Sequence, residues 1–460
     1  MTFGQRVPLN KLIKERACRA IIYALLAIFI NFFPANLRAD TVTQKSELAA
    51  YVSNNPSDLD KTYRFVSVSI ETGDYEAAIG ALERILMFNP RLSRAEMELG
   101  FLYARLGAFQ AASEHLNSAL NIGDLNTSQQ TQIRAQLADI DKRNQKNRVT
   151  GRILAGLRAQ TNANFFPSNG LFQIGGVGYG STLRRQGDVN SYEMIQIAHD
   201  YDFENQNGDQ LETRGAFYAT QQFTIPTLNV SVFSASVGPR FGVPEAPVRG
   251  VSVKPYVAGI ASTLGNQNYL NAGGAGLVTR IPITQTFSID PGFEWRSLFV
   301  NRNNATNGGY VYSTISTIAS GDAVTGYVSG IFQFSDRIKF EGRAAFTRAN
   351  AFLAVQTSDQ IDFQGMARIE FDPPNKEFGQ RWTVAPFVRY TNLRFMEANP
   401  LVDPWIARHD DMWAGGILLD APINEDIGFM GNIEYANNIS NISNYKLDNF
   451  LVSLGPVVKF

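Results

Sequence analysis

The sequence has 460 residues, of which 44% are hydrophobic and 18% are charged, and its formal net charge is −1. A disordered chain would carry fewer apolar residues and more net charge, so the composition argues against disorder. It also argues against a nucleic-acid partner, because general nucleic-acid binding needs a concentrated basic face that displaces phosphate counterions.

Residues 1–39 have the layout of a secretory signal sequence. Basic residues precede an apolar run at residues 20–33, and the small residue Ala39 follows it. The run falls short of the roughly 20 apolar residues of a membrane-spanning helix, so a retained anchor is the less favoured alternative. We therefore predict cleavage after Ala39. The single cysteine, Cys18, lies before that site, so the mature chain would have no thiol for disulfides, catalysis or metal binding.

Residues 40–148 contain a helical repeat. The segments at residues 73–90 and 107–123 align without gaps at an offset of 34 residues, which is the period of tetratricopeptide helix pairs. Small residues let the two helices of a pair approach closely, and an aromatic residue fills the space between them. The predicted packing positions are Gly73, Tyr75, Ala77, Gly107, Phe109 and Ala111. A last polar helix is expected at residues 127–148.

A stack of such helix pairs offers a concave groove to a peptide or a partner protein. The polar first-helix residues Arg64, Glu98 and Arg105 are the predicted client-facing positions. The alternative is that the repeats serve as a spacer or a plug beside the next domain.

Residues 149–460 are predicted to form an antiparallel β-barrel. Beyond residue 40 no long apolar stretch occurs, so a membrane could be crossed by strands alone, and these must close into a barrel to pair every backbone group. Segments such as residues 337–346 and 359–372 alternate apolar with polar side chains, as strands do when one face meets an apolar medium. We expect an even number of strands, 14 or 16. A soluble β-sandwich, with its apolar face turned inward, is the alternative.

Two further patterns favour the membrane barrel. Connections alternate between short ones, at residues 335–336 and 421–426, and long ones, at residues 349–360, 392–410 and 437–444. Aromatic residues also recur near segment ends, as at membrane interfaces. These residues are Tyr310, Tyr312, Trp382, Tyr390, Trp413, Phe429, Tyr435 and Phe460.

The polar face of the alternating segments would line the lumen of the barrel. The predicted lumen-lining residues are Asp200, Asp202, Lys339, Arg343, Asp362, Arg368, Glu370, Arg381, Arg389 and Glu434. Two carboxylates could in principle act as an acid and a base, but a water-filled barrel needs a mixed polar lining in any case, so we expect no enzyme activity.

The last strand ends on an aromatic residue after an apolar face that includes Leu454, Val458 and Phe460. The outer-membrane assembly machinery recognises an amphipathic strand of this kind, so these three residues are the predicted insertion signal.

The sequence shows no compact catalytic, cofactor or metal motif. His115, His199 and His409 lack the spacing of metal ligands. The glycine-rich residues 175–180 do not complete a dinucleotide-binding loop and no βαβ pattern surrounds them, so we interpret them as small residues of a strand that faces a crowded lumen.

The junction between repeats and barrel resembles that of the surface lipoprotein assembly modifiers. The resemblance rests on residues 94–120, the polar helix after them, and a first strand at residues 151–169 with Gly156, Asn162 and Asn164; after residue 172 it is loose. It implies an α + β multidomain chain: periplasmic tetratricopeptide-type α-helical repeats, then a transmembrane barrel in the outer membrane of a Gram-negative bacterium. It also implies movement of lipoproteins or other folded proteins across that membrane.

Three functions follow as hypotheses. The first is a translocation or assembly pore whose periplasmic repeats bind a client protein or lipoprotein, with outer-membrane lipid and the barrel assembly machinery as further partners and with no cofactor. The second is a polysaccharide export porin, which a lumen of one charge sign would favour. The third is a structural or adhesion barrel whose repeats tether partners.

Overall fold

The computed structural model describes residues 35–55, 58–143, 145–205, 207–300, 320–375, 378 and 380–460. These residues form two compact units that divide between Asn144 and Gln145. Most of the predicted signal sequence, including Cys18, lies outside the described residues, as do Tyr310 and Tyr312.

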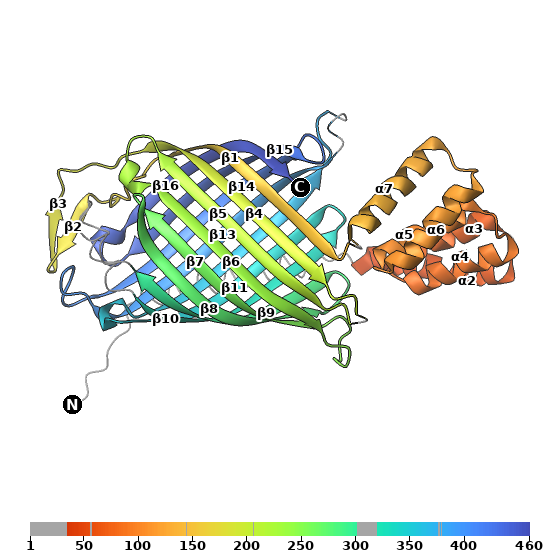
Figure 1. The fold of residues 1–460 in the computed structure, drawn as a ribbon, viewed down its shortest axis with the longest axis horizontal. Coiled ribbons are helices and arrows are strands. Elements are labelled where there is room, and N and C mark those ends of the chain that lie inside the picture. The colour runs from red at the N-terminus through yellow and green to blue at the C-terminus, as the bar shows by residue number, and fades with distance from the viewer. Residues whose placement is uncertain are drawn as a thin grey trace. The chain divides into compact units, whose positions relative to one another are not determined.

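Within its described residues the first unit consists of six helices (Figure 1). They are α2 (Ala35–Asn54), α3 (Leu59–Glu71), α4 (Tyr75–Phe88), α5 (Ser93–Arg105), α6 (Phe109–Ile122) and α7 (Thr127–Arg143). The turns inside the pairs α3–α4 and α5–α6 are built alike, because Gly73 and Gly107 both have a φ of 77°, a conformation that glycine adopts without strain. The prediction of tetratricopeptide-type repeats is therefore confirmed.

Two of the alanines predicted to pack in the helical core are not the most buried ones. In each case the next residue in the sequence is the buried one. Ala78 and Ala112 are fully buried, whereas Ala77 and Ala111 are half-buried. Each buried alanine lies four residues before a fully buried leucine, Leu82 or Leu116, and residues at this spacing share one helix face. The aromatic residues Tyr75 and Phe109 pack at the edge of these clusters and are half-buried.

The predicted last helix ends earlier than expected, at Arg143, and β1 begins at Asn147 rather than at residue 149. The reason is strand pairing: from Asn147 onward every residue of β1 has a partner on β4. Arg148, which the sequence placed at the end of that helix, instead lies on β1 and binds Asp200 of β4 at 2.8 Å.

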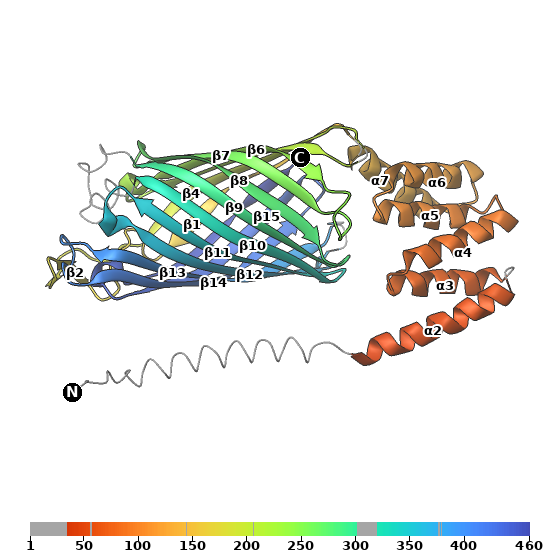
Figure 2. The same ribbon diagram turned by 90° about the horizontal axis from the view of Figure 1, so that it is seen from below.

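Fourteen strands of the described chain close into an antiparallel barrel, which confirms the lower of the two predicted strand numbers. They are β1 (Asn147–Gln160), β4 (Asp188–Asp202), β5 (Gln210–Gln222), β6 (Val230–Gly242), β7 (Ser252–Leu264), β8 (Gln267–Pro282), β9 (Phe287–Val300), β10 (Gly321–Ser335), β11 (Ile338–Ala351), β12 (Ser358–Phe371), β13 (Trp382–Ala398), β14 (Ala407–Pro422), β15 (Ile427–Ser440) and β16 (Leu447–Lys459). Neighbours in sequence are neighbours in the sheet, and β1 closes the barrel against β16 (Figures 1 and 2).

We call the end of the barrel where β1 begins and β16 ends the proximal end, and the opposite end the distal end. The expected alternation of short and long connections holds only in part. The three predicted long connections shrink to residues 352–357, 399–406 and 441–446, because the flanking strands continue their pairing through the polar residues assigned to loops. The distal turn at residues 265–266 is short, and the proximal connection at residues 372–381 is longer.

A two-stranded hairpin, β2 (Leu171–Ile174) and β3 (Val177–Gly180), lies outside the barrel sheet. Gly175 and Gly176 form its turn, and their N–H groups donate to the carbonyls of Leu401 and Val402 at 3.1 and 2.9 Å. The interpretation of residues 175–180 as a lumen-facing barrel strand was therefore wrong. The predicted first strand is also shorter than expected, because the Asn162 side chain bonds the carbonyls of Phe166 and Asp448 and holds the chain in a loop after Gln160.

The seam between β1 and β16 contains a close backbone approach. The residue pairing is interrupted between Leu154 and Leu157 of β1, where Gly156 lies opposite Gly455. A Cβ atom added at Gly455 would lie 2.7 Å from the Cα of Gly156 and closer still to the carbonyl of Ala155. The seam thus requires glycine at this point.

The two faces of the barrel differ in polarity. On one face, side chains bond across an intervening strand: Lys254 of β7 contacts Glu212 of β5 at 2.8 Å, and Lys459 of β16 contacts Asp420 of β14 at 3.0 Å. Only the concave side of a curved sheet brings alternate strands this close, so the polar face lines the lumen. The opposite face carries exposed apolar side chains such as Leu454.

Candidate functional site

Two sites emerge from this fold, a groove in the helical unit and a pocket in the lumen of the barrel. The groove has a volume of about 510 Å³ and lies among α3, α5, α6 and α7. Its lining is Ile70, Glu98, Phe101, Leu102, Ala104, Arg105, Phe109, Gln136 and Asp139. A lining that combines apolar side chains with polar groups of both charge signs suits an extended or helical peptide segment.

The structure brings together two of the three predicted client-facing residues, Glu98 and Arg105, both on α5. Arg64 is exposed on α3 but is not among the lining residues. The residue of α3 that reaches the groove is Ile70 instead. Phe101, Gln136 and Asp139 were not predicted, because the repeat pattern does not show how α7 lies against α5.

The surroundings of Glu98 shift the pKa of its carboxyl. Burial raises the pKa of its carboxyl above the ordinary value, and the nearby Arg94 guanidinium offsets this only in part. Arg94 itself lies over the ring of Tyr63, 4.1 Å from the centroid, and burial raises the pKa of the Tyr63 hydroxyl to about 12. A client that places a cation beside Glu98 would stabilise its ionised form.

Nine of the ten predicted lumen residues lie at inward-facing strand positions, and Arg381 lies directly before β13, 3.6 Å from Glu370. The nine are Asp200, Asp202, Lys339, Arg343, Asp362, Arg368, Glu370, Arg389 and Glu434. What these residues do stays a prediction.

Inward-facing charges on β10–β16 are mostly paired with one another. Glu341 binds Lys339 at 2.9 Å and Arg368 at 2.8 Å, and Arg389 binds Glu434. These contacts give this wall of the lumen a lining of mixed charge sign.

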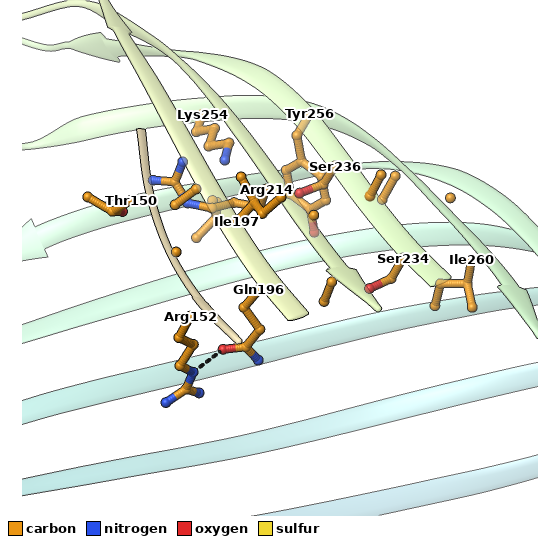
Figure 3. Close-up of a pocket in the computed structure, with 18 of the residues that line it drawn as sticks. Thr150, Arg152, Gln196, Ile197, Arg214, Ser234, Ser236, Lys254, Tyr256 and Ile260 are labelled. Atoms are coloured by element: carbon orange, nitrogen blue, oxygen red, sulfur yellow. Dashed lines mark hydrogen bonds between the residues drawn. The ribbon is translucent and has the colours of Figure 1, made fainter. Parts of the chain in front are cut away.

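A pocket of about 880 Å³ opens from the inner face of β1 and β4–β10 and from the end of β16 (Figure 3). Its cationic lining residues are Arg152, Arg214, Arg240, Lys254, Arg296 and Lys459. Its uncharged polar lining includes Gln196, Ser234, Ser236, Tyr256 and Tyr327, and its lining carboxylate is Glu294. Figure 3 shows Arg152 bonded to Gln196 on the neighbouring strand, a contact of 2.6 Å.

Apart from Asp200, the charged residues around this pocket were not among the sequence-predicted lumen residues. The predictions came mainly from the C-terminal strands, where charged and apolar residues alternate clearly. The signal in the N-terminal strands is weaker: Glu212 and Arg214 stand two apart on β5, and Arg152 and Arg158 share one face of β1. Alternation places such residues inward, but it does not show which of them meet.

The three residues of the predicted insertion signal all face outward, and each is exposed. Phe460 forms a reciprocal backbone pair with Gly151: its N–H donates to the Gly151 carbonyl at 3.0 Å and its carbonyl accepts from the Gly151 N–H at 2.7 Å. The Phe460 ring covers Gly151 closely, so a side chain there would collide with it. Leu454 and Val458 extend the same outward row.

The histidines lie in three separate places. His115 stacks on Tyr103 and bonds Glu96 at 2.6 Å, while His199 and His409 lie beside asparagine side chains on different strands. In the part of the chain that the structure describes, no three metal-binding side chains gather closely enough to hold an ion.

No family model matches the sequence, and no curated protein matches it. Among solved structures, the chain is similar to the TPR domain of P58(IPK), with 21% identity, a TM-score of 0.21, and coverage of 23% of this chain and 29% of that one. It is similar to an outer-membrane channel from Pseudomonas putida F1, with 9% identity, a TM-score of 0.35, and coverage of 68% and 95%. It is also similar to Salmonella typhi OmpF, with 10% identity, a TM-score of 0.35, and coverage of 68% and 97%.

The chain thus spans less than a third of the P58(IPK) structure and nearly all of the two barrels. Within the described residues, no helix has both the length and the apolar character that crossing a membrane would take.

Proposed function

We propose that this chain is an outer-membrane pore that translocates or assembles proteins, lipoproteins above all, and that its periplasmic repeats bind the client before the barrel passes it. The observation that carries the proposal is the union, on one chain, of a helical repeat unit with an open groove and a closed barrel with a polar lumen.

The outer face of the barrel supports the membrane location. Exposed apolar side chains such as Phe363, Ile433 and Leu454 face outward from different strands, which would be costly in water but suits lipid. Trp413 and Tyr390 pack against each other on this face, with ring centroids 4.3 Å apart and ring planes tilted by 38°, and aromatic residues of this kind are enriched at membrane interfaces.

Outward-facing charges gather beyond these aromatic residues, toward the distal end. Arg348 of β11 binds Asp359 of β12 at 3.0 Å, and His409 of β14 lies 3.8 Å from Asp411. Polar residues at this level suit lipid head groups rather than acyl chains.

The groove supports client binding. Its lining includes the apolar side chains of Ile70, Phe101 and Phe109, and Glu98 and Arg105 offer opposite charges on one helix. The resemblance at the repeat-to-barrel junction supports a lipoprotein client.

The test compares cells that carry or lack the gene, with surface-exposed lipoproteins labelled by a membrane-impermeant biotin reagent. In cells that lack the gene, we expect a set of lipid-anchored proteins to be missing from the biotin-labelled surface fraction. The same proteins should still be present in these cells, where the reagent cannot reach them. An unchanged surface set would contradict the proposal.

Charge reversals then separate the groove from general charge effects. Arg105→Glu changes a groove residue, whereas Arg84→Glu makes the same change at an exposed site on α4 outside the groove. Arg84→Glu should restore surface display and Arg105→Glu should not. Equal restoration would show that the groove does not bind the client.

One observation favours the polysaccharide export porin as a second candidate. The pocket in the lumen is lined by an excess of cations, which would suit an anionic polymer. Loss of a capsule or exopolysaccharide from cells lacking the chain, with surface lipoproteins unchanged, would select this function.

A further inference from the structure

We propose that the lumen pocket on β1 and β4–β10 binds a multivalent oxyanion, a ligand with several phosphate or carboxylate groups. This site goes beyond the proposed function, because it does not depend on which client crosses the barrel. Its physical basis is a concentration of inward-facing cations that the protein's own carboxylates do not balance.

The centre of the cluster is a network of four cations over two carboxylates. Glu212 binds Arg240 at 2.6 Å and Lys254 at 2.8 Å. Arg214 contacts Glu212 at 3.8 Å and binds Asp200 at 2.6 Å.

The fourth cation is Arg148, which binds the same Asp200 at 2.8 Å. Four positive charges therefore share two negative ones. The Lys254 and Glu212 side chains are each only 8% exposed, whereas Arg148 and Arg214, which share Asp200, are 39% and 40% exposed. The excess positive charge therefore lies where an anion in the lumen can reach it.

Arg152 adds a fifth cation to this wall. Its Nε donates to the amide oxygen of Gln196 at 2.6 Å, and within the described residues no carboxylate forms an ion pair with it. A neutral partner orients the guanidinium without cancelling its charge, so the remaining N–H groups can donate to a ligand oxygen in the bidentate geometry that arginine favours.

The opposite wall of the lumen lacks such an excess. There Glu434 pairs with Arg389 and Asp410 pairs with Arg408. Asp362 is bound by the Thr391 hydroxyl at 2.6 Å and by the Gln360 amide. On that wall Glu341 pairs with both Lys339 and Arg368, an excess of one positive charge. The excess is therefore greater at the pocket, where four cations share two carboxylates and Arg152 adds a fifth.

The size and the remaining lining indicate the ligand class. About 880 Å³ is far more than a single small anion needs, so several anionic groups can be held together. Ser234 and Ser236 place hydroxyl groups on the same wall as Arg214 and Lys254 (Figure 3). Guanidinium, ammonium and hydroxyl donors together match the oxygens of phosphates and carboxylates.

The test is calorimetric titration of the purified full chain in a neutral detergent with tripolyphosphate and, separately, with citrate. We expect saturable binding of at least one probe, weakened by salt. The tighter probe identifies the ligand as phosphate-type or carboxylate-type. If neither probe binds at millimolar concentration, the proposal is wrong.

Two variants test the role of Arg152. Arg152→Gln removes the charge, while Gln196→Glu keeps the arginine and supplies the carboxylate that it lacks. Each should weaken binding about tenfold, the effect of one charge-assisted hydrogen bond. Parental affinity in both variants would overturn the assignment.

Arg368→Gln is the matched control, because it removes one inward-facing cation from the opposite wall and leaves Glu341 paired with Lys339. It should bind the probes like the parent. An equal loss in this control would mean that the probes respond to the total charge of the lumen and would overturn a local site. The heat-dependent shift of the barrel on gels verifies folding of every variant.

Discussion

The helical unit and the barrel turn their apolar side chains in opposite directions. In the helices, Leu82 and Leu116 are fully buried between neighbours, whereas in the barrel Leu454 is 59% exposed on the outer face. Leucine therefore stabilises the helical unit by packing against other side chains. In the barrel, leucine on the outer face can contribute only through contact with the medium outside the barrel. Substitutions at the barrel seam, in the helical core and on the two faces of the barrel test this difference.

The largest effect is expected at the barrel seam, where backbone spacing rather than polarity is decisive. Gly455→Val would place side-chain atoms against Ala155 and Gly156 of β1, an overpacking that costs roughly 3 kcal/mol or more. The barrel should then fail to close, seen as loss of the faster-migrating folded band on unheated gels.

Gly215→Val is the control for the seam, because nothing lies within 4 Å of a Cβ atom added there. It should give a normal folded band. Normal closure of Gly455→Val as well would show that the close approach of β1 and β16 is unimportant.

The next largest effect is expected in the core of the helices. Leu116→Ala removes a fully buried side chain and should destabilise the repeats by about 2–5 kcal/mol. The half-buried Phe109 should cost less when changed to alanine, because part of its surface is already in contact with solvent. Thermal unfolding of the full chain followed by far-ultraviolet circular dichroism measures both, and the reverse order would contradict the burial argument.

The smallest effect concerns the cap of α4. Asp74 accepts a hydrogen bond from the N–H of Ala77 at 3.1 Å and pairs with Lys45, so Asp74→Ala should cost about 1 kcal/mol at neutral pH. The hydrogen bond from Lys45, followed by that from Ala77, lowers the pKa of Asp74. A lowered pKa means that the stabilisation is present above the ordinary carboxyl range and is lost as the pH falls through the folded-state value.

The parent and Asp74→Ala should therefore converge in stability in acid. Asp58→Ala, which removes the cap of α3, controls for helix capping in general. A difference between Asp74→Ala and the parent that stayed constant down to low pH would contradict the role of the ionised carboxylate.

The sequence predicted those features that repeat along the chain. The offset of 34 residues placed Gly73 and Gly107 in equivalent turns, and alternation placed Asp362 and Arg389 at inward-facing positions. Neither pattern could predict contacts between strands that are not adjacent in sequence. The sharing of Glu212 by cations of β6 and β7 depends on the curvature of the closed barrel, which no local pattern contains.

The same limit explains the incorrect assignments. Residues 175–180 have the composition of a strand, but their hairpin is bonded to residues 401–402, more than 200 positions later. The groove was only partly predicted, because Gln136 reaches it through the packing of α7 and not through the repeat.

The most direct test of whether the outer face of the barrel meets lipid is to introduce the same charge on each of the two faces of β16. Leu454→Arg places arginine on the outer face, where it would cost about 2–4 kcal/mol near the middle of a bilayer. Leu451→Arg places arginine on the inner face, directly opposite Glu434. We predict that the yield of folded barrel in the outer-membrane fraction falls sharply for Leu454→Arg and stays near that of the parent for Leu451→Arg. Equal yields, or a greater loss for Leu451→Arg, would contradict a barrel whose outer face meets lipid.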